Sequence, residues 1–330
     1  MKKVQSEIKS HSYKAAQFAG NGKIDLVQVE QRPPEAGEVR IKMEGCGVCA
    51  SNLPMWEGRD WFQYPSEPGA PGHEGWGIIE EVGSDVNSVK PGDRVAALSY
   101  HAYAEIDYAA ADQVVPLPKE LKGQLFPAEP LGCAVNIFGR SDIKAEQSVA
   151  VIGVGFLGAL LTQLAKSAGA KVIAISRRQF ALDVAKDNGA NETITLDDKW
   201  QVVEKVKELT GGNMCQRVLE VTGYQMPLDL AGEITGTRGK MIIAGFHQDG
   251  PRQVDMQSWN WKGIDVINAH ERDPRQYMEG IKNAIQAVVD RKLQPDSLIT
   301  HRFSLKKLDK AFELMQERPE GFLKAVMEIK

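Results

Sequence analysis

Residues 148–170, "SVAVIGVGFLGALLTQLAKSAGA", decide the fold of the second half of the chain. The run 148–152 is continuously apolar, which is typical of a strand buried on both faces of a sheet. From Phe156 onward, apolar residues return every three or four positions, as they do along one face of a helix. The stretch therefore predicts a buried strand, a tight turn and a helix.

The glycines of that turn have the spacing Gly153-x-Gly155-x-x-Gly158. The first allows the tight turn, the second lets a pyrophosphate approach the backbone, and the third lets the helix pack closely on the strand. The start of the helix adds main-chain N–H groups and the positive end of the helix dipole. We therefore expect a dinucleotide to bind here, in contact with Gly153, Gly155, Phe156, Leu157 and Gly158.

The next expected strand, 171–176, ends at the residue that selects the cofactor. An NAD site usually has an acidic residue about 20 residues past the first glycine, where it binds the ribose 2′-hydroxyl. This chain has Ser176 there, followed by Arg177 and Arg178. A carboxylate repels a 2′-phosphate, whereas a hydroxyl and a guanidinium group bind one. The sequence favours NADP(H); the alternative is a solvated helix start that accepts either cofactor.

The two halves of the chain differ in pattern. Residues 14–118 carry short β-like runs broken by Gly and Pro, which predict a small β-rich domain. After residue 148, strands and helices alternate, which predicts a parallel sheet with helices on both faces. A long amphipathic helix is expected from residue 274, and 330 residues are enough for two domains.

Cys49, His73 and Glu74 form a candidate zinc site. Cys49 lies in "GCGVCAS", residues 45–51, and the other two follow 24 residues later in a Gly/Pro-rich turn. A thiolate, an imidazole and a carboxylate make a mixed ligand set, typical of catalytic rather than structural zinc. Because Cys46 and Cys49 have C-x-x-C spacing, a thiol–disulfide pair is the alternative.

A fourth ligand is expected from "PAEPLGCAVN", residues 127–136. Glu129 and Cys133 both lie near the start of a predicted helix, and either could complete the ligand set. Cys133 and Cys215 also fit the pattern of small, buried apolar residues.

Six segments together resemble the zinc-dependent medium-chain dehydrogenase/reductase family. They are "CGVCASNLPMWEGR", "PGAPGHEGWGIIEEVGSDV", "KPGDRV", "EPLGCAVN", "VIGVGFLGALLTQLAK" and "LITHRFSLKKLDKAFELM". The resemblance implies an α/β fold with a GroES-like β-barrel catalytic domain, residues 1–140 completed by 271–330. The other domain, residues 141–270, would be a Rossmann doubly wound parallel sheet that binds NADP. The alcohol and polyol branch, with sorbitol and threonine dehydrogenases, is the most similar.

The resemblance also implies a ligand set. Cys49, His73, Glu74 and Glu129 would bind one catalytic zinc, with Cys133 as the substitute for Glu129. Cys46 falls where many members carry an incidental cysteine. The four-cysteine lobe that binds a structural zinc in many members is missing from this sequence, so we expect one zinc per chain.

The implied activity is hydride transfer between NADP(H) and a secondary alcohol or ketone. Ser51, two residues past Cys49, is expected to accept the hydroxyl proton of the substrate. Because Pro54 replaces the relay histidine of some alcohol dehydrogenases, transfer beyond Ser51 would go through water, the cofactor ribose or another side chain. The alternative is a zinc-free, NADPH-dependent quinone or enone reductase of the same fold. That branch typically lacks the ligand cysteine and the Gly-His-Glu turn.

Polar and aromatic residues near the zinc ligands favour a polyol- or sugar-like substrate. By family position, Ser99 falls in the substrate pocket, and Tyr100 and His101 make that wall polar. Trp56 and Trp61 either offer faces to a sugar-like ring or are core and subunit contacts.

Composition excludes other classes of function. The net charge of −4 and the lack of a long basic run predict no nucleic-acid partner. The charged start of the chain lacks the apolar core of a signal peptide, and no segment approaches the ~20 apolar residues of a membrane span. Four cysteines do not make a disulfide scaffold. We expect a cytoplasmic enzyme with a small-molecule substrate, and by family habit a homodimer or homotetramer built through a sheet-edge strand near 258–269.

Overall fold

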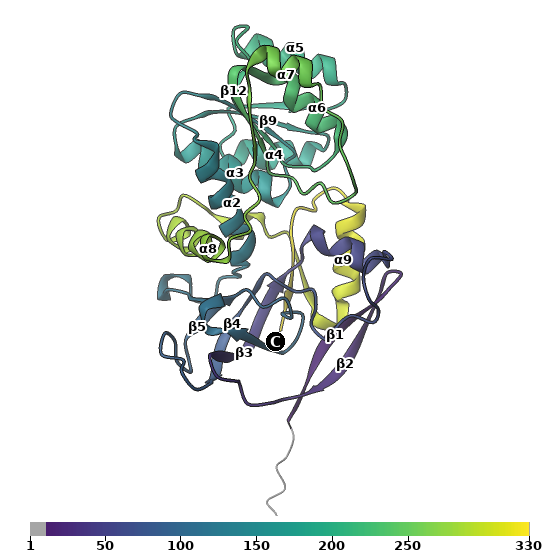
Figure 1. The fold of residues 1–330 in the computed structure, drawn as a ribbon, viewed down its shortest axis with the longest axis vertical. Coiled ribbons are helices and arrows are strands. Elements are labelled where there is room, and N and C mark those ends of the chain that lie inside the picture. Colours follow the sequence, from purple (N-terminus) through teal and green to yellow (C-terminus); the bar gives the residue numbers. More distant parts are fainter. Residues whose placement is uncertain (1–10, 330) are drawn as a thin grey trace, which may run out of the picture. The chain divides into compact units, whose positions relative to one another are not determined.

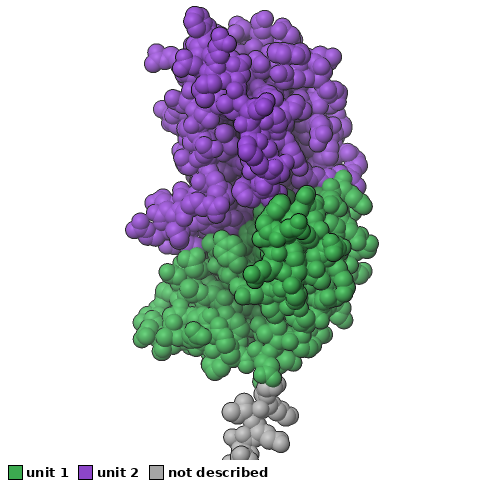
Figure 2. All heavy atoms as spheres, turned by 45° about the vertical axis from the view of Figure 1, so that its right-hand side comes forward, with its two compact units in different colours: residues 1–127, 302–317, 325–330 green, residues 128–301, 318–324 purple. Residues whose placement is uncertain are grey.

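The structure, a computed structural model, describes residues 11–329. It divides into two compact units, which Figure 2 colours separately. Unit 1 contains the described residues up to Pro127, then Arg302–Glu317 and the chain from Ala325; unit 2 contains Ala128–His301 and Arg318–Lys324. The expectation that the chain carries no signal peptide concerns its first residues, and residues 1–10 lie outside the described part of the chain.

Unit 1 is mainly β-structure, as the Gly- and Pro-broken pattern predicts (Figure 1). Its main sheet has the order β14-β15-β3-β4-β5-β7, β6 pairs with β3, and β1 and β2 form a separate pair. The strands are β1 (Ser12–Gly20), β2 (Lys23–Glu30), β3 (Glu38–Gly47), β4 (Gly75–Val82), β5 (Arg94–Ala97), β6 (Ile106–Ala110), β7 (Val114–Pro116), β14 (His301–Ser304) and β15 (Ala325–Glu328). The helices are α1 (Leu53–Glu57) and α9 (Leu308–Glu317), with 3-10 turns at Ala50–Asn52, Ala111–Gln113, Lys119–Leu121 and Leu305–Lys307.

An aromatic cluster joins the C-terminal helix of unit 1 to its strands. The ring of Phe312, on α9, lies 5.3 Å from that of Phe18 in an edge-to-face arrangement and 6.1 Å from that of Tyr103. All three side chains are fully buried. Such aromatic pairs add about 0.5–1.5 kcal/mol each beyond the area they bury. The cluster therefore holds a segment from the end of the chain against strands from its beginning.

Unit 2 contains a parallel sheet of six strands in the order β10-β9-β8-β11-β12-β13. They are β8 (Ser148–Ile152), β9 (Lys171–Ser176), β10 (Glu192–Thr195), β11 (Cys215–Glu220), β12 (Thr235–Ile243) and β13 (Asp265–Asn268). The helices are α2 (Ala128–Ser141), α3 (Phe156–Ser167), α4 (Gln179–Asp187), α5 (Lys199–Leu209), α6 (Gln225–Ile234), α7 (Met256–Lys262) and α8 (Pro274–Val289), with a 3-10 turn at Pro295–Leu298. This confirms the predicted parallel, doubly wound sheet, whose two edge strands are β10 and β13.

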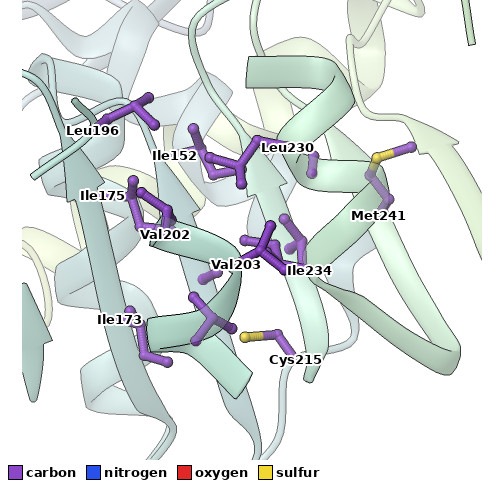
Figure 3. Packing of buried hydrophobic residues seen from close by; sticks show 14 of the residues in the cluster. Ile152, Ile173, Ile175, Leu196, Val202, Val203, Cys215, Leu230, Ile234 and Met241 are labelled. Carbon is purple, nitrogen blue, oxygen red and sulfur yellow. The ribbon is translucent and has the colours of Figure 1, made fainter. Parts of the chain in front are cut away.

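One face of this sheet packs against α5 and α6 (Figure 3). Alternate strand residues point into this layer, including Ile173 and Ile175, and meet Val202 and Ile234 from the helices. Each such side chain contributes about 1.5–3 kcal/mol by leaving water. Cys215 lies in the same cluster, fully buried, and burial raises the pKa of its thiol to about 12. Cys215 is thus a small apolar core residue, as one interpretation of the sequence predicted.

The main segment of unit 2 runs from Ala128 to His301, whereas the expected domain boundaries lie at residues 140 and 270. The reason is the packing of α2 against α8, both of which belong to unit 2. At their contact a Cβ added to Gly132 would lie 2.7 Å from the Ile281 side chain, so glycine permits the close approach of the helices. Among residues 11–329, no helix is both long and apolar enough to cross a membrane.

Candidate active site

The two closely spaced cysteines have different environments. Cys46 lies within β3 and is fully buried, with its Sγ 3.4 Å from the Gly47 carbonyl oxygen. Cys49 follows the strand in extended backbone, is half-buried, and begins the 3-10 turn Ala50–Asn52. No disulfide joins these two residues. The thiol of Cys49 is therefore the one positioned for chemistry.

His73 and Glu74 lie in the turn that enters β4. Nδ1 of His73 is 2.9 Å from the carbonyl oxygen of Pro71. Because a carbonyl oxygen only accepts hydrogen bonds, Nδ1 carries the proton and the lone pair of the neutral ring lies on Nε2. His73 and Glu74 are both buried, at 8% and 1% exposure. The turn thus presents one imidazole nitrogen and one carboxylate in a site largely closed to water.

The ligand atoms of Cys49, His73 and Glu74 all lie within 4.8 Å of one another. A sulfur, a nitrogen and an oxygen at this separation fit a single zinc ion, and three protein ligands are the usual number for catalytic zinc. The structure thus brings together the three residues that the sequence predicted as a cluster, from two segments 24 positions apart.

Gly47 makes room for this cluster. A Cβ added at Gly47 would lie 1.8 Å from Oε2 of Glu74, so only glycine leaves space for the carboxylate. The main-chain N–H of Gly47 also donates to the carbonyl oxygen of Glu74 over 3.0 Å. The end of β3 and the His73–Glu74 turn are thereby held in direct contact.

Ser51 and Tyr103 support the same region. The Ser51 hydroxyl donates to Sγ of Cys49 over 3.2 Å. The hydroxyl of the fully buried Tyr103 lies 3.0 Å from Oδ1 of Asn52 and 3.2 Å from the carbonyl oxygen of Gly47. Burial is the main cause that raises the Tyr103 pKa well above its usual range. Tyr103 thus stays protonated and bridges the two ends of the Cys49 segment, a role that no sequence signal indicated.

The glycine turn of unit 2 has the geometry expected of a phosphate-binding turn. Gly153 has a φ of 96°, and a Cβ at Gly158 would lie 2.1 Å from the carbonyl oxygen of Gly153. Gly155 precedes α3, and a Cβ there would meet nothing within 4 Å. Two glycines are therefore required by the protein's own packing, while Gly155 faces open space where a ligand can approach. Phe156 and Leu157 form the first turn of α3.

The residues predicted to select the cofactor lie at the end of β9. Ser176 is buried, Arg177 is exposed, and Arg178 is half-buried. Nη1 of Arg178 donates to the carbonyl oxygen of Phe322 over 2.7 Å. Burial and the neighbouring Arg318 lower the pKa of Arg178 from its ordinary value. Of the two arginines, Arg178 holds a chain segment in place, and Arg177 extends into solvent.

Comparison with known proteins decides the family. The alcohol dehydrogenase GroES-like domain model matches residues 35–119, and the zinc-binding dehydrogenase model matches residues 157–287. An alcohol dehydrogenase of Geobacillus stearothermophilus is 32% identical over 254 residues, which cover 68% of this chain and 74% of the relative. The chain belongs to the zinc-dependent medium-chain dehydrogenase/reductase family.

Other members match along nearly the whole length of this dehydrogenase. The 2-dehydro-3-deoxy-L-galactonate 5-dehydrogenase of Pseudoalteromonas atlantica is 25% identical over 343 residues, which cover 95% of this chain and 98% of the relative. The solved 2R,3R-butanediol dehydrogenase of Bacillus subtilis shares the fold, with a TM-score of 0.84, 24% identity, and coverage of 97% and 100% of the two chains. The expected GroES-like and Rossmann folds are confirmed, and the protein is an oxidoreductase of the alcohol and polyol dehydrogenase type.

Glu129 and Cys133, the candidates for the dehydrogenase's fourth zinc ligand, lie on α2 in unit 2. Both contact Tyr277 of α8: its hydroxyl donates to Oε1 of Glu129 and lies 3.2 Å from Sγ of Cys133. The Cys133 thiol donates to the same Glu129 oxygen over 3.3 Å. Burial raises the pKa of Tyr277, which keeps it a hydrogen-bond donor. The choice between Glu129 and Cys133 stays a prediction, and Tyr277 is a partner that the sequence did not indicate.

The expected polar wall of the dehydrogenase has a buried support. The hydroxyl of Ser99 donates to the carboxylate of Asp107 and accepts from the main-chain N–H of His101 over 3.2 Å. Burial raises the pKa of Asp107 to about 6. Tyr100 is 54% exposed, and its ring lies 5.8 Å from that of His73. Ser99 thus holds its own loop, and the exposed ring of Tyr100 lies beside the candidate metal ligand His73.

The two tryptophans that follow Cys49 in the sequence differ in their surroundings. Trp56 is 6% exposed and stacks on Phe312 with a centroid distance of 6.1 Å, so it belongs to the core. Trp61 is 65% exposed, with the guanidinium of Arg59 5.9 Å from its ring.

We predict that Cys49→Ser lowers the zinc content of the purified protein from about one ion per chain to well below one, because an alcohol is a far weaker zinc ligand than a thiolate. The matched control is Cys46→Ser, three residues away and outside the cluster, which should retain the metal. Elemental analysis against protein concentration measures both. Equal zinc in the two variants would contradict the assignment of Cys49.

Gly47→Ala should displace the Glu74 carboxylate, because the added methyl group would overlap its oxygen. We expect a loss of about 1–3 kcal/mol in the free energy of unfolding, as for other overpacked sites, together with weaker zinc binding. Gly139→Ala on α2 is the control, since a Cβ there meets nothing within 4 Å. Chemical denaturation with and without zinc tests both variants, and a Gly47→Ala protein as stable and as zinc-loaded as the wild type would refute the close contact.

Proposed function

We propose that this dehydrogenase binds one zinc ion and transfers a hydride between NADP(H) and a secondary alcohol or ketone on a polyol- or sugar-like substrate. The observation that carries the proposal is the convergence of Cys49, His73 and Glu74 within 4.8 Å. Glu129 is the proposed fourth ligand, with Cys133 as the substitute. When bound, zinc supplies Lewis acidity toward the substrate oxygen, and the nicotinamide exchanges a hydride with the substrate carbon.

The residues around the cluster orient the ligands and move a proton. The hydrogen bond to Pro71 fixes the tautomer of His73, which leaves Nε2 as the ligand atom. The Ser51 hydroxyl directs its proton to Sγ of Cys49, so the lone pairs of Oγ remain available to accept the proton of a substrate hydroxyl. Ser51 is therefore the proposed proton relay: Oγ accepts the substrate proton as its own hydroxyl proton passes to solvent water, to which its half-buried position gives access.

The preference for NADP(H) rests on the charges at the end of β9. Ser176 takes the place of the carboxylate that would repel a 2′-phosphate, and Arg177 is an exposed guanidinium next to it. Because Arg178 already donates to Phe322, Arg177 is the proposed phosphate ligand.

The substrate proposal rests on the exposed aromatic and polar groups of unit 1. Tyr100 lies beside His73, and His101 contacts Glu67 over 2.9 Å, so this wall offers both a ring face and hydrogen-bonding groups. Such a combination suits a polyhydroxylated chain or ring better than a simple aliphatic alcohol. The alternative, a zinc-free quinone or enone reductase, leaves the convergence of thiol, imidazole and carboxylate unexplained.

Arg177→Ala should raise the Kd of NADPH by about tenfold and change the Kd of NADH by less than about twofold, because only NADPH carries the 2′-phosphate. Fluorescence titration measures both constants. Lys171→Ala is the control, since it removes a cation from the other end of the same strand. Equal losses for the two cofactors would refute the NADP(H) preference.

Ser51→Ala should lower turnover by about 10²–10⁴-fold, the usual contribution of a positioned proton acceptor, while the zinc content stays unchanged. Ser51→Thr keeps the hydroxyl and should retain most of the activity. Steady-state rates with a panel of sugar alcohols and NADP⁺, together with metal analysis, test the pair. Unchanged turnover in Ser51→Ala would mean that the proton leaves by another route.

A further inference from the structure

Unit 2 contains a buried carboxylate that the proposed chemistry does not use. Glu220 ends β11 and is fully buried. Its Oε1 accepts from the main-chain N–H groups of Thr222, over 2.7 Å, and Gly223, over 3.1 Å, and from the Thr222 hydroxyl. A buried charge is costly unless it is hydrogen-bonded. Glu220 therefore organises the turn that follows its own strand.

The other oxygen of Glu220 begins a chain of polar groups. Oε2 lies 3.0 Å from Nε2 of His247, and Nε of Arg252 donates to Nδ1 of His247 over 2.9 Å. Because a guanidinium only donates, Nδ1 must accept, and the proton of the neutral ring lies on Nε2 and is donated to Glu220. His247 thus links a carboxylate to a guanidinium in one defined tautomer. We call Glu220, His247 and Arg252 the polar chain.

The polar chain ties together the segments that follow two neighbouring strands. Nη2 of Arg252 donates to the carbonyl oxygen of Gly223 over 2.7 Å. Both ends of the polar chain therefore bind the same turn, residues 221–223. A Cβ added at Gly223 would lie 2.4 Å from the carbonyl oxygen of Phe246, and one at Gly245 would lie 2.3 Å from the N atom of Gly223. Backbone packs directly on backbone here, so any shift of one segment moves the other.

This paired segment borders the glycine turn. A Cβ added at Gly153 would lie 2.5 Å from Cγ2 of Thr222. The strand order reverses between β8 and β11, and a dinucleotide binds across such a point with one half on each side. Because the proposed 2′-phosphate site lies on β9, the nicotinamide half falls on the β11 and β12 side. Phe246 is 53% exposed there and stacks on His270 with a centroid distance of 5.8 Å.

We propose that Glu220, His247 and Arg252 are positioning residues for the nicotinamide half of the cofactor. They do not touch the reacting atoms; they hold residues 221–223 and 245–247 in the conformation that receives the nicotinamide riboside. This proposal rests on the proposed function as a nicotinamide-dinucleotide enzyme. Because these residues are already held in place, the protein loses less conformational entropy when the cofactor binds.

The test separates the two halves of the cofactor. Calorimetry measures the Kd of NADPH and of 2′,5′-ADP, which lacks the nicotinamide riboside, for the wild type and for His247→Leu. We expect His247→Leu to raise the Kd of NADPH by about tenfold, the worth of one or two lost hydrogen bonds, and to leave the Kd of 2′,5′-ADP within about twofold. Arg252→Gln, at the outer end of the polar chain, should act in the same direction if His247→Leu fails to fold.

Two further variants serve as controls. His247→Gln keeps an amide donor for Glu220 and an amide oxygen for Arg252, so it should restore NADPH binding. Val254→Ala, an exposed residue of the same loop outside the polar chain, should bind both ligands like the wild type. Thermal unfolding of every variant shows whether it is folded.

The outcomes are distinct. If folded His247→Leu and Arg252→Gln bind NADPH like the wild type, or lose NADPH and 2′,5′-ADP equally, the positioning role is overturned while the proposed function stands. If the wild type itself binds neither NADPH nor NADH, the proposed function fails, and this inference fails with it. If the wild type prefers NADH, the same comparison is made with NADH and AMP.

Discussion

The Glu74 carboxylate occupies the space where a side chain of residue 47 would stand, and the candidate metal cluster depends on that contact. It brings the end of β3 against the turn before β4, which sets Cys49 beside His73. Unit 2 uses the same device at Gly158, where a helix begins against the carbonyl oxygen of Gly153. In both units a missing side chain lets two backbone segments approach closely, and the chemical groups follow from that approach.

The two units divide the chemistry between them. Unit 1 contributes a thiol, an imidazole and a carboxylate in a buried cluster, together with the exposed ring of Tyr100. Unit 2 contributes the open backbone of Gly155 and the positive end of α3, which suit phosphate groups. A zinc-dependent hydride transfer needs both contributions, and family membership provides the reason to expect them in one chain.

Much of this was predictable from the sequence because its signals are local. The buried run 148–152 and the spacing of three glycines each carry their meaning within a few residues, and the strand β8, helix α3 and strand β9 follow. The Cys49 and His73–Glu74 pairing was predictable from ligand chemistry. Tyr103, Tyr277 and the partners of Glu220 were not, because each acts through contacts between distant residues that leave no periodic pattern. The packing of α2 on α8 leaves no local signal for the same reason.

The metal content of the wild-type protein, purified without chelators and measured by mass spectrometry against protein concentration, tests most directly whether this dehydrogenase uses zinc. We expect about one zinc per chain, since one mixed ligand set is available among the described residues and a four-cysteine lobe is missing from the sequence. Such a result would justify a screen of sugar alcohols with NADP⁺. A protein without zinc that still reduces quinones or enones with NADPH would instead be the zinc-free reductase.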